Sequence, residues 1–293
     1  MATLDRQATT LALAHALSAA ERGLAVIPLS RTKLPALRSP HRDDPDPAPG
    51  RPPCRGECGR FGHGVHDASA DPARVRALFA AAPRATGYGI ACGLPPYHLI
   101  GVDLDTKAGT DAVAALRGLA RRHRFTVPAT VVVLTPSGGR HLWLSGPADV
   151  VVPNSASRLA PGIDIRGAGG YLVGPGSRTE RGVYAVAPGT AHLPPAPCPR
   201  ALLRLLLPPP HAPGQRAHPP GDRSGESLVR FVLAAHEGQR NARLFWAACR
   251  AYETGIGPAL TTALTLAATT TGLTEREARA TIASAARRTD RRP

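Results

Sequence analysis

The sequence predicts an α+β fold followed by a small all-α module. Short runs rich in β-branched residues alternate with helical stretches up to residue 186, whereas only helical patterns follow residue 221. Between residues 187 and 222 there are eleven prolines, a composition typical of a linker. We therefore expect a larger domain at residues 1–197, a linker at residues 198–222, in which residues 199–207 could hold a short helix, and a helical module at residues 223–293.

The local patterns place the individual elements. In the larger domain, helices are expected at residues 5–22 and 110–123 and strands at 24–29, 88–91, 99–104, 130–134, 141–144, 163–166 and 171–173. Asp71 and Pro72 form a typical helix start. The strands at 163–166 and 171–173 are expected to pair as a hairpin. The module is expected to contain helices at 224–236, 241–254, 258–270 and 274–287, the last opened by a capping box of Thr274 and Glu277.

Composition and charge favour a nucleic-acid partner over a membrane. The 293 residues include 36 Lys and Arg against 21 Asp and Glu, a formal net charge of +15. The apolar stretches near residues 9–20 and 259–273 are shorter than the roughly 20 residues that a spanning helix needs. Asp5 precedes the first stretch and His15 interrupts it, so we interpret this segment as a helix of a cytoplasmic protein rather than a signal peptide.

Two aspartates lie in the strand-like segment Ile-Gly-Val-Asp-Leu-Asp at residues 100–105. Because side chains alternate along a strand, Val102 and Leu104 are expected on one face, and Asp103 and Asp105 on the other. Neighbouring carboxylates repel each other unless a cation neutralises them, and oxygen ligands suit Mg²⁺ or Mn²⁺. The segment therefore predicts a divalent metal site, with two solvated acids at a strand end as the alternative.

Two other segments repeat the alternation. Asp164 and Arg166 are expected on the polar face of the strand at 163–166, and His141 is expected to point outward from the strand at 141–144. Three carboxylates with a histidine and an arginine on one sheet face resemble a two-metal site for phosphoryl or nucleotidyl transfer.

The turn Ser137-Gly138-Gly139 offers backbone N–H groups and a hydroxyl, as a bound triphosphate needs. The alternatives are an ordinary hairpin turn and, for the histidine that follows, a solvated surface side chain.

A Cys/His cluster suggests a structural zinc ion. Cys54, Cys58 and His63 have spacings that suit tetrahedral Zn²⁺, and His66 or His41 would supply the fourth ligand. The loop is poor in apolar residues, so a metal would give it order. The alternative is free cysteines beside unrelated histidines. Cys92, Cys198 and Cys249 show no such pattern and are expected to be ordinary core or linker residues.

Three motifs occur in the order of a known family. They are Val-Asp-Leu-Asp at 102–105, Thr-Pro-Ser-Gly-Gly-Arg-His-Leu-Trp at 135–143 and Ile-Asp-Ile-Arg-Gly-Ala-Gly-Gly-Tyr-Leu-Val at 163–173. They resemble the hDhD, sGGxH and hD motifs of the bifunctional DNA primase/polymerase (Prim-Pol) domain of the archaeo-eukaryotic primase superfamily. The resemblance extends over about residues 7–186 and includes Lys33-Leu34-Pro35, which matches a K-x-P element of that family. It implies an RRM-like catalytic core, here with a zinc-bearing loop insertion at residues 41–66.

The resemblance implies a DNA-dependent nucleotidyltransferase that makes and extends primers in DNA replication by two-metal catalysis. Asp103, Asp105 and Asp164 would hold Mg²⁺ or Mn²⁺. The residues implied in nucleotide binding are Ser137, Gly138, Gly139, His141, Arg166 and Lys33, of which Arg166 and Lys33 would contact phosphate or template. The implied partners are a single-stranded DNA template and nucleoside triphosphates. No Walker A motif occurs in the sequence, so a replicative helicase would be a separate chain.

Two other functions use the same residues. A nuclease would apply the carboxylates to phosphodiester hydrolysis, and a non-enzymatic replication accessory protein would use the basic surface and the zinc loop to bind nucleic acid. In the helical module, residues 238–245 resemble a segment found after Prim-Pol domains. Its Arg240 and Arg243 are expected either to bind template or to lie on the solvated side of the bundle.

Overall fold

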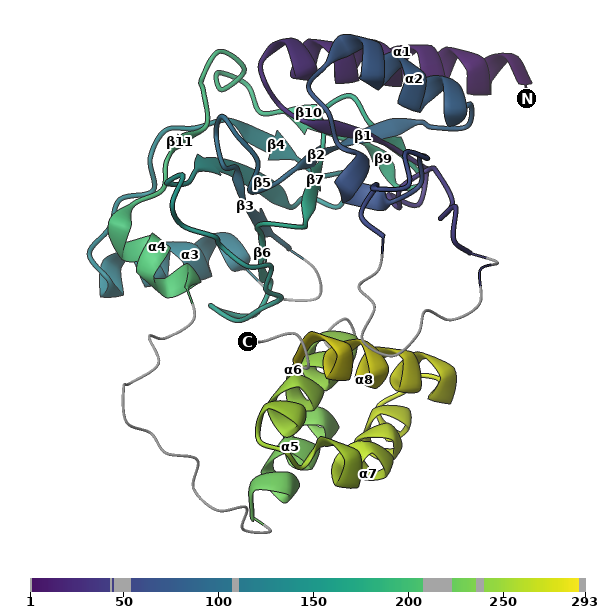
Figure 1. The fold of residues 1–293 in the computed structure, drawn as a ribbon. Coiled ribbons are helices and arrows are strands. Elements are labelled where there is room, and N and C mark those ends of the chain that lie inside the picture. Colours follow the sequence, from purple (N-terminus) through teal and green to yellow (C-terminus); the bar gives the residue numbers. More distant parts are fainter. Residues whose placement is uncertain are drawn as a thin grey trace. The chain divides into compact units, whose positions relative to one another are not determined.

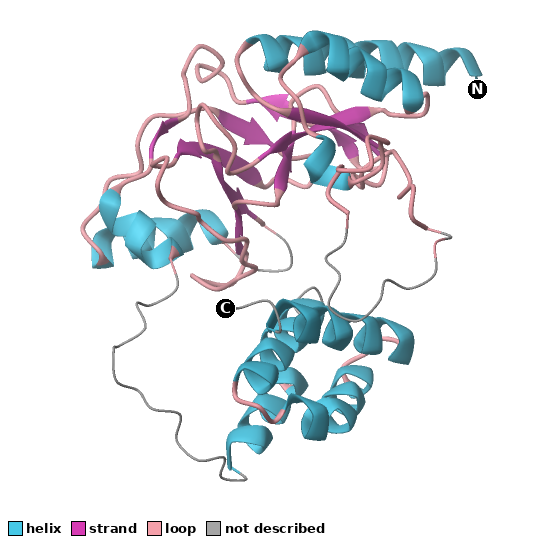
Figure 2. Cartoon of the chain, in the orientation of Figure 1, coloured by secondary structure: helices cyan, strands magenta, loops and turns pink. Residues whose placement is uncertain are grey.

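The computed structural model describes residues 2–42, 44, 54–106, 111–207, 223–235 and 240–289. These residues form two compact units, one made of described residues up to 207 and the other of residues 223–289. Figure 2 shows helices together with strands in the first unit and helices alone in the second. The predicted mixed fold with helices at the carboxyl end is therefore confirmed.

The first unit contains two larger sheets, both mainly antiparallel, and a separate two-stranded sheet. The smaller sheet has the order β1-β2-β7, with β1 (Val26–Leu29), β2 (Gly87–Ala91) and β7 (Tyr171–Val173). The larger sheet has the order β10-β4-β5-β3-β6, with β3 (Ile100–Leu104), β4 (Val132–Leu134), β5 (Arg140–Ser145), β6 (Ile163–Arg166) and β10 (Ala185–Val186). β11 (Ala196–Pro197) adds to β5 in parallel, and β8 (Arg178–Thr179) pairs with β9 (Gly182–Val183).

Helices cover both sides of this arrangement. α1 (Ala2–Glu21) and α2 (Pro72–Ala81) lie side by side against β1 and β2 (Figure 1). α3 (Ala112–Arg122) and α4 (Arg200–Leu206) pack on the opposite side, where Leu116, Leu202 and Leu206 join the core of the larger sheet. A 3-10 helix, η1 (Gly64–Asp67), follows the Cys/His loop. None of the helices among the described residues combines the length and apolar character needed to cross a membrane.

The predicted start of α2 is confirmed. Asp71 is the N-cap, and its carboxylate accepts hydrogen bonds from the N–H groups of Ala73 and Arg74. These bonds satisfy two of the backbone donors that a helix start leaves without an intrahelical partner.

The predicted hairpin of residues 163–166 and 171–173 is wrong. β6 pairs with β3 in the larger sheet, whereas β7 pairs with β2 in the smaller one. The link at residues 167–170 crosses between the sheets, and Asn154 holds it through its side chain, which accepts from the Gly167 N–H and donates to the Ala168 carbonyl. Local turn residues suit either connection, so pairing with β3 and β2 decides the outcome.

The second unit consists of α5 (Arg223–Leu233), α6 (Arg240–Glu253), α7 (Gly257–Thr270) and α8 (Glu275–Thr289). Its core combines leucines such as Leu244 and Leu264 with many alanines, which allow the helices to approach closely. The capping box is confirmed: Glu277 accepts from the Thr274 N–H, and the Thr274 hydroxyl accepts from the Glu277 N–H.

The segment predicted as a linker begins with structure. α4 lies within residues 198–207 and buries Leu202 and Leu206 in the first unit. The remainder of the predicted linker, residues 208–222, lies outside the described residues.

Candidate active site and metal centre

Strand register places three candidate side chains in one row across the larger sheet. Asp103 on β3 lies opposite His141 on β5 and opposite Asp164 on β6. Val102 and Leu104 point into the core shared with α3 and α4, so the alternation along β3 is the expected one. Residues that are far apart in the sequence thus become neighbours on one sheet face.

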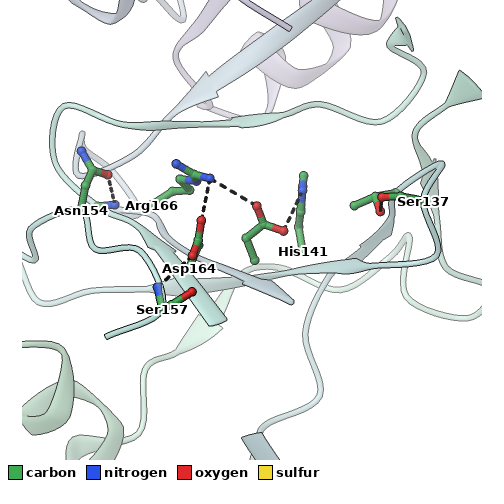
Figure 3. Close-up of polar contacts among 9 residues, drawn as sticks. Ser137, His141, Asn154, Ser157, Asp164 and Arg166 are labelled. Atoms are coloured by element: carbon green, nitrogen blue, oxygen red, sulfur yellow. Dashed lines mark hydrogen bonds and ion pairs between the residues drawn. The ribbon is translucent and has the colours of Figure 1, made fainter. Parts of the chain in front are cut away.

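Arg166 joins the two aspartates of this row. Its guanidinium nitrogen Nη2 lies 3.2 Å from Asp164 Oδ2 and 3.6 Å from Asp103 Oδ2. On the other side, Asp103 Oδ1 lies 3.5 Å from His141 Nε2 (Figure 3). The Ser157 N–H donates to Asp164 Oδ1 at 2.9 Å and so fixes the orientation of this carboxylate.

The electrostatics of the row favour a bound cation. Burial raises the pKa of Asp164, and the negative charges of Asp103 and Asp105 raise it further, while Arg166 opposes the shift. Asp105 follows directly after β3, and its backbone N–H donates to the Gly162 carbonyl. Asp164, with Asp103 and Asp105 near it, thus provides a set of carboxylate oxygens that suits Mg²⁺ or Mn²⁺.

His141 is buried rather than solvated. It is 4% exposed, although the alternation along its strand predicts that it points outward. The reason is that the face of β5 carrying His141 is covered, with the Tyr184 ring 5.5 Å from its own. Burial, with Arg166 nearby, lowers the pKa of His141 to about 4. A neutral imidazole therefore faces Asp103.

The turn between β4 and β5 lies against the end of β3. A Cβ on Gly139 would lie 2.6 Å from the carbonyl oxygen of Leu104, so only glycine allows this approach. Gly138 has a φ of +86°, which glycine adopts without strain. The exposed Ser137 forms a hydroxyl contact of 3.1 Å with Thr135, and its carbonyl accepts from Thr106 at 3.3 Å. The turn thus lies next to Asp105.

Several residues at this site were not found from the sequence. Tyr171 donates its hydroxyl to the Lys33 carbonyl at 2.9 Å and so ties the exposed Lys33 to β7. Tyr184 packs on His141, and burial raises the pKa of Tyr184 to about 12, with Asp103 and Asp105 adding to the shift. Ser157 acts through its backbone. Tyr171 lies within the third motif at residues 163–173 and could have been considered, whereas nothing in the sequence singles out Ser157.

The Cys/His loop brings four potential metal ligands together. One ligand atom from each of His41, Cys54, Cys58 and His63 lies within 4.8 Å of the others. His66, the other candidate for the fourth position, is not in this group. Burial lowers the pKa of His66. Two thiols and two imidazoles suit Zn²⁺.

Both histidines of this group are oriented by a carboxylate. His41 Nδ1 lies 2.6 Å from Asp44 Oδ2, and His41 Nε2 is buried without a hydrogen-bond partner among the described residues. His63 Nδ1 lies 3.5 Å from Asp67 Oδ1, while His63 Nε2 lies 3.5 Å from Cys58 Sγ. Each ring thus presents Nε2 to the group, the arrangement in which an outer carboxylate fixes a ligating imidazole. Asp44 and Asp67 were not predicted from the sequence.

The remaining cysteines are as expected. Cys92 is buried in the core, and burial raises the pKa of its thiol to about 12. Cys198 is partly buried beside α4, where desolvation raises its pKa to about 11. Cys249 packs against the helical core of the second unit.

Arg243 of the second unit is occupied within the unit. Its guanidinium donates to the carbonyls of Phe231 and Ala234 at the end of α5, and it lies 4.7 Å from the centre of the Phe231 ring. It therefore serves as a cap for α5. Residues 238 and 239 of the segment resembling other Prim-Pol proteins lie outside the described residues.

Comparison with models of known protein families gives a match over most of the first unit. The Prim-Pol family model, described as bifunctional DNA primase/polymerase, N-terminal, matches residues 16–201. The matched segment includes the row on the larger sheet, the turn before β5 and the Cys/His loop. No curated protein matches the chain significantly.

Proposed function

The chain belongs to the Prim-Pol family of bifunctional DNA primase/polymerases, and from this membership we propose that it synthesises primers on a single-stranded DNA template and extends them. Membership implies an enzyme that acts on a DNA template with nucleotide substrates. We further propose which residues carry out the reaction and which metal ions they hold.

One observation is the main support for this proposal. The carboxylates of Asp103 and Asp164 share a row with His141, and the row lies beside the turn that holds Ser137. Metal ligands next to a turn with accessible donors are what a triphosphate substrate requires. Hydrolysis of a phosphodiester needs the carboxylates but not this turn, which favours nucleotidyl transfer over a nuclease.

In the proposed reaction, a 3′-hydroxyl attacks the α-phosphate of the incoming nucleotide, and pyrophosphate leaves. Asp103, Asp105 and Asp164 would hold two divalent ions, which when bound neutralise charge on the attacking and leaving oxygens. Such a reaction depends on positioning and charge neutralisation more than on covalent catalysis. The side chains that hold the nucleotide are therefore as important as the metal ligands.

The triphosphate contacts are assigned to residues around the row. Because His141 is neutral, it would donate a hydrogen bond to a phosphate oxygen without placing a second positive charge beside the metal ions. Ser137 and the N–H groups of Gly138 and Gly139 would hold the outer phosphates. Arg166 and Lys33 would contact phosphate or template from the opposite side of the row.

The strand order supports an RRM-like core. The four central strands run β4-β5-β3-β6, with α3 between β3 and β4, as in half of a βαββαβ unit. The connection from β5 to β6 has no helix in the described residues, which is where this chain departs from the full pattern.

The Cys/His loop is proposed as a structural zinc centre with His41 as the fourth ligand. The unpartnered His41 Nε2 and the two carboxylate–histidine pairs support this assignment. Hydrogen bonding from the Arg60 backbone lowers the pKa of the Cys58 thiol, which favours the thiolate that a metal binds.

The decisive experiment compares priming and extension in the wild type and in two aspartate variants. Asp103→Ala and Asp105→Ala should abolish nucleotide incorporation with Mg²⁺ or Mn²⁺ while leaving template affinity close to that of the wild type, because basic residues supply most of the affinity for phosphate. Asp149→Ala, which changes an exposed loop aspartate, is the matched control.

Three outcomes separate the functions. Loss of incorporation in both variants, with the control active, supports the polymerase. Metal-dependent cleavage of DNA without incorporation by the wild type would indicate a nuclease. Template binding with neither activity would indicate an accessory protein.

A further inference from the structure

Two short segments of the first unit expose four basic residues. They are Arg31 and Lys33 in the turn at residues 30–34, directly after β1, and Arg178 and Arg181 in the hairpin of β8 and β9. Glu180 is the one acidic residue of these two segments. The segments therefore carry an excess of exposed positive charge.

Hydrogen bonds join the turn to the hairpin. Thr86, directly before β2, donates its N–H to the Leu29 carbonyl at 3.0 Å and its hydroxyl to the Arg178 carbonyl at 2.7 Å. The Arg178 N–H donates back to the Thr86 carbonyl at 2.9 Å, and the Glu180 N–H lies 3.4 Å from the Arg31 carbonyl. The turn and the hairpin thus form one continuous surface, which we call the basic surface.

The basic surface lies beside the candidate active site. A Cβ built on Gly182 would lie 3.1 Å from the Pro136 Cβ, so the hairpin packs on the turn between β4 and β5. Tyr184, which directly follows β9, packs on the ring of His141. Burial lowers the pKa of His141, and Lys33 is among the cations that lower it further. Contacts and charge therefore both connect the basic surface with the row on the larger sheet.

The arginines of the basic surface are not used to hold the fold. Their guanidinium groups form no hydrogen bond or ion pair within the part of the chain that the structure describes. Arg166 in the candidate active site, in contrast, pairs with Asp164 at 3.2 Å. The charges of the basic surface are therefore available to a ligand, and glutamine at these positions would remove charge without breaking a contact.

Lys33 has a strained backbone. Its φ is +69°, in the region that favours glycine, and the Tyr171 hydroxyl donates to its carbonyl at 2.9 Å. Strain of this kind is concentrated at functional sites. The turn thus keeps a lysine at a position where glycine would be less strained, which indicates that its charge is used.

Each segment also exposes an apolar side chain. Leu34 in the turn is 63% exposed, and Val183 in the hairpin is 44% exposed. A single DNA strand leaves the faces of its bases accessible, whereas a duplex stacks them inside. Surfaces that bind single strands combine cations for the backbone with side chains that contact the bases. This combination favours a single strand over a duplex.

From these features we propose that the basic surface binds the template strand beside the candidate active site, an inference that rests on the proposed function. The four cations would contact phosphates, and Leu34 and Val183 would contact bases. Cations spread over two segments suit an extended polyanion better than a compact triphosphate. The proposal also assigns Lys33 to the template, where the sequence leaves phosphate and template open.

The test is a titration of a labelled oligothymidylate of about 16 nucleotides. Fluorescence anisotropy gives its Kd over a range of salt concentrations, without divalent metal or nucleotide. The double variant Arg178→Gln/Arg181→Gln is compared with Arg117→Gln/Arg121→Gln, which removes two exposed arginines from α3 on the opposite side of the larger sheet. Urea unfolding first shows that both double variants are folded.

We expect the hairpin variant to weaken binding and to reduce its salt dependence. Each phosphate contact of a single strand contributes about 0.7 to the slope of log K against log salt, so loss of two contacts should lower the slope by about 1.4 and raise the Kd at 0.15 M salt by about tenfold. The α3 variant should change neither quantity. The wild type should bind the single strand more tightly than a duplex of the same length.

Three results would overturn the proposal. They are an unchanged Kd and slope in the hairpin variant, equal losses in both double variants, and binding of the duplex at least as tight as that of the single strand. Because the titration contains no nucleotide, its outcome is independent of catalysis. A wild type that binds as expected but incorporates no nucleotide would contradict the proposed function and not this surface. An active wild type with normal template binding by the hairpin variant would contradict the surface alone.

Discussion

His141 differs from a surface histidine in two properties that affect its chemistry. It is buried beside Asp103, and its pKa is lowered to about 4 by that burial. At neutral pH it is therefore an uncharged donor, and the proposed contact with a phosphate would depend on its position and not on ionic attraction.

His141→Ala should weaken nucleotide use much more than template binding. Loss of one hydrogen bond to a charged phosphate group costs about 1.5–3 kcal/mol, which corresponds to about tenfold or more in kcat/KM for the nucleotide. Steady-state kinetics and a template-binding titration measure the two effects separately. His192→Ala, which changes an exposed histidine, is the control, and unchanged nucleotide kinetics in His141→Ala would remove His141 from the site.

The metal centre allows the two candidate fourth ligands to be distinguished. The purified chain should contain about one zinc ion, since the group provides one set of four ligands. His41→Ala and Cys58→Ser should lower the zinc content, whereas His66→Ala should not. Elemental analysis of the three variants gives the answer, and the reverse result for the two histidines would exchange their roles.

Individual site residues could be predicted from the sequence where two of them lie close together on one strand. The pair Asp103 and Asp105 follows from alternation within five residues. The choice of His41 over His66 does not, because thirteen positions separate His41 from Cys54, and only the folded loop brings their side chains together. The burial of His141 could not be predicted either, because the segments that cover this sheet face, which include Tyr184, are distant in the sequence.

At the scale of elements, the turn between β4 and β5 depends on a single close contact. Gly139 lies against the end of β3, where a Cβ would meet the Leu104 carbonyl. Backbone atoms cannot move aside as a flexible side chain can, so a larger residue would displace the turn from Asp105.

Gly139→Ala should therefore impair nucleotide incorporation by about tenfold or more, as expected for a displacement of roughly 1 Å in a positioned group. Gly118→Ala is the matched control, because no atom lies within 4 Å of a Cβ built in the middle of α3. The control should raise the free energy of unfolding by about 0.5–1 kcal/mol. Incorporation assays and urea unfolding of both variants test the pair, and wild-type incorporation by Gly139→Ala would show that the turn is not part of the site.

Helix ends were predictable, whereas strand partners were not. Asp71 and Thr274 act within three residues of their own positions, so their capping bonds can be inferred from local sequence. The partners of β6 and β7 lie about 60 and about 80 residues away, in β3 and β2. Such pairing is decided by the whole core, and the glycines at residues 167–170 suit a hairpin equally well.

At the scale of the whole molecule, the two units raise the question of what the helical one contributes. The unit at residues 223–289 has its own core and its own caps, and Arg243 is used inside it. A role in holding the template would therefore depend on other basic residues of that unit.

Truncation after Leu207 tests this contribution. The cut keeps α4, whose Leu202 and Leu206 are buried in the first unit; a cut after Pro197 would remove both and lower stability by several kcal/mol, at about 2–5 kcal/mol for each buried leucine lost. We expect de novo priming to fall more than extension of an existing primer. A preformed primer–template duplex supplies its own contacts, whereas initiation must hold two free nucleotides together against their translational entropy. Both rates are measured on one template, after urea unfolding has shown that the shortened chain is folded. Equal loss of both activities would indicate a general binding role, and retention of both would make the helical unit a surface for another protein.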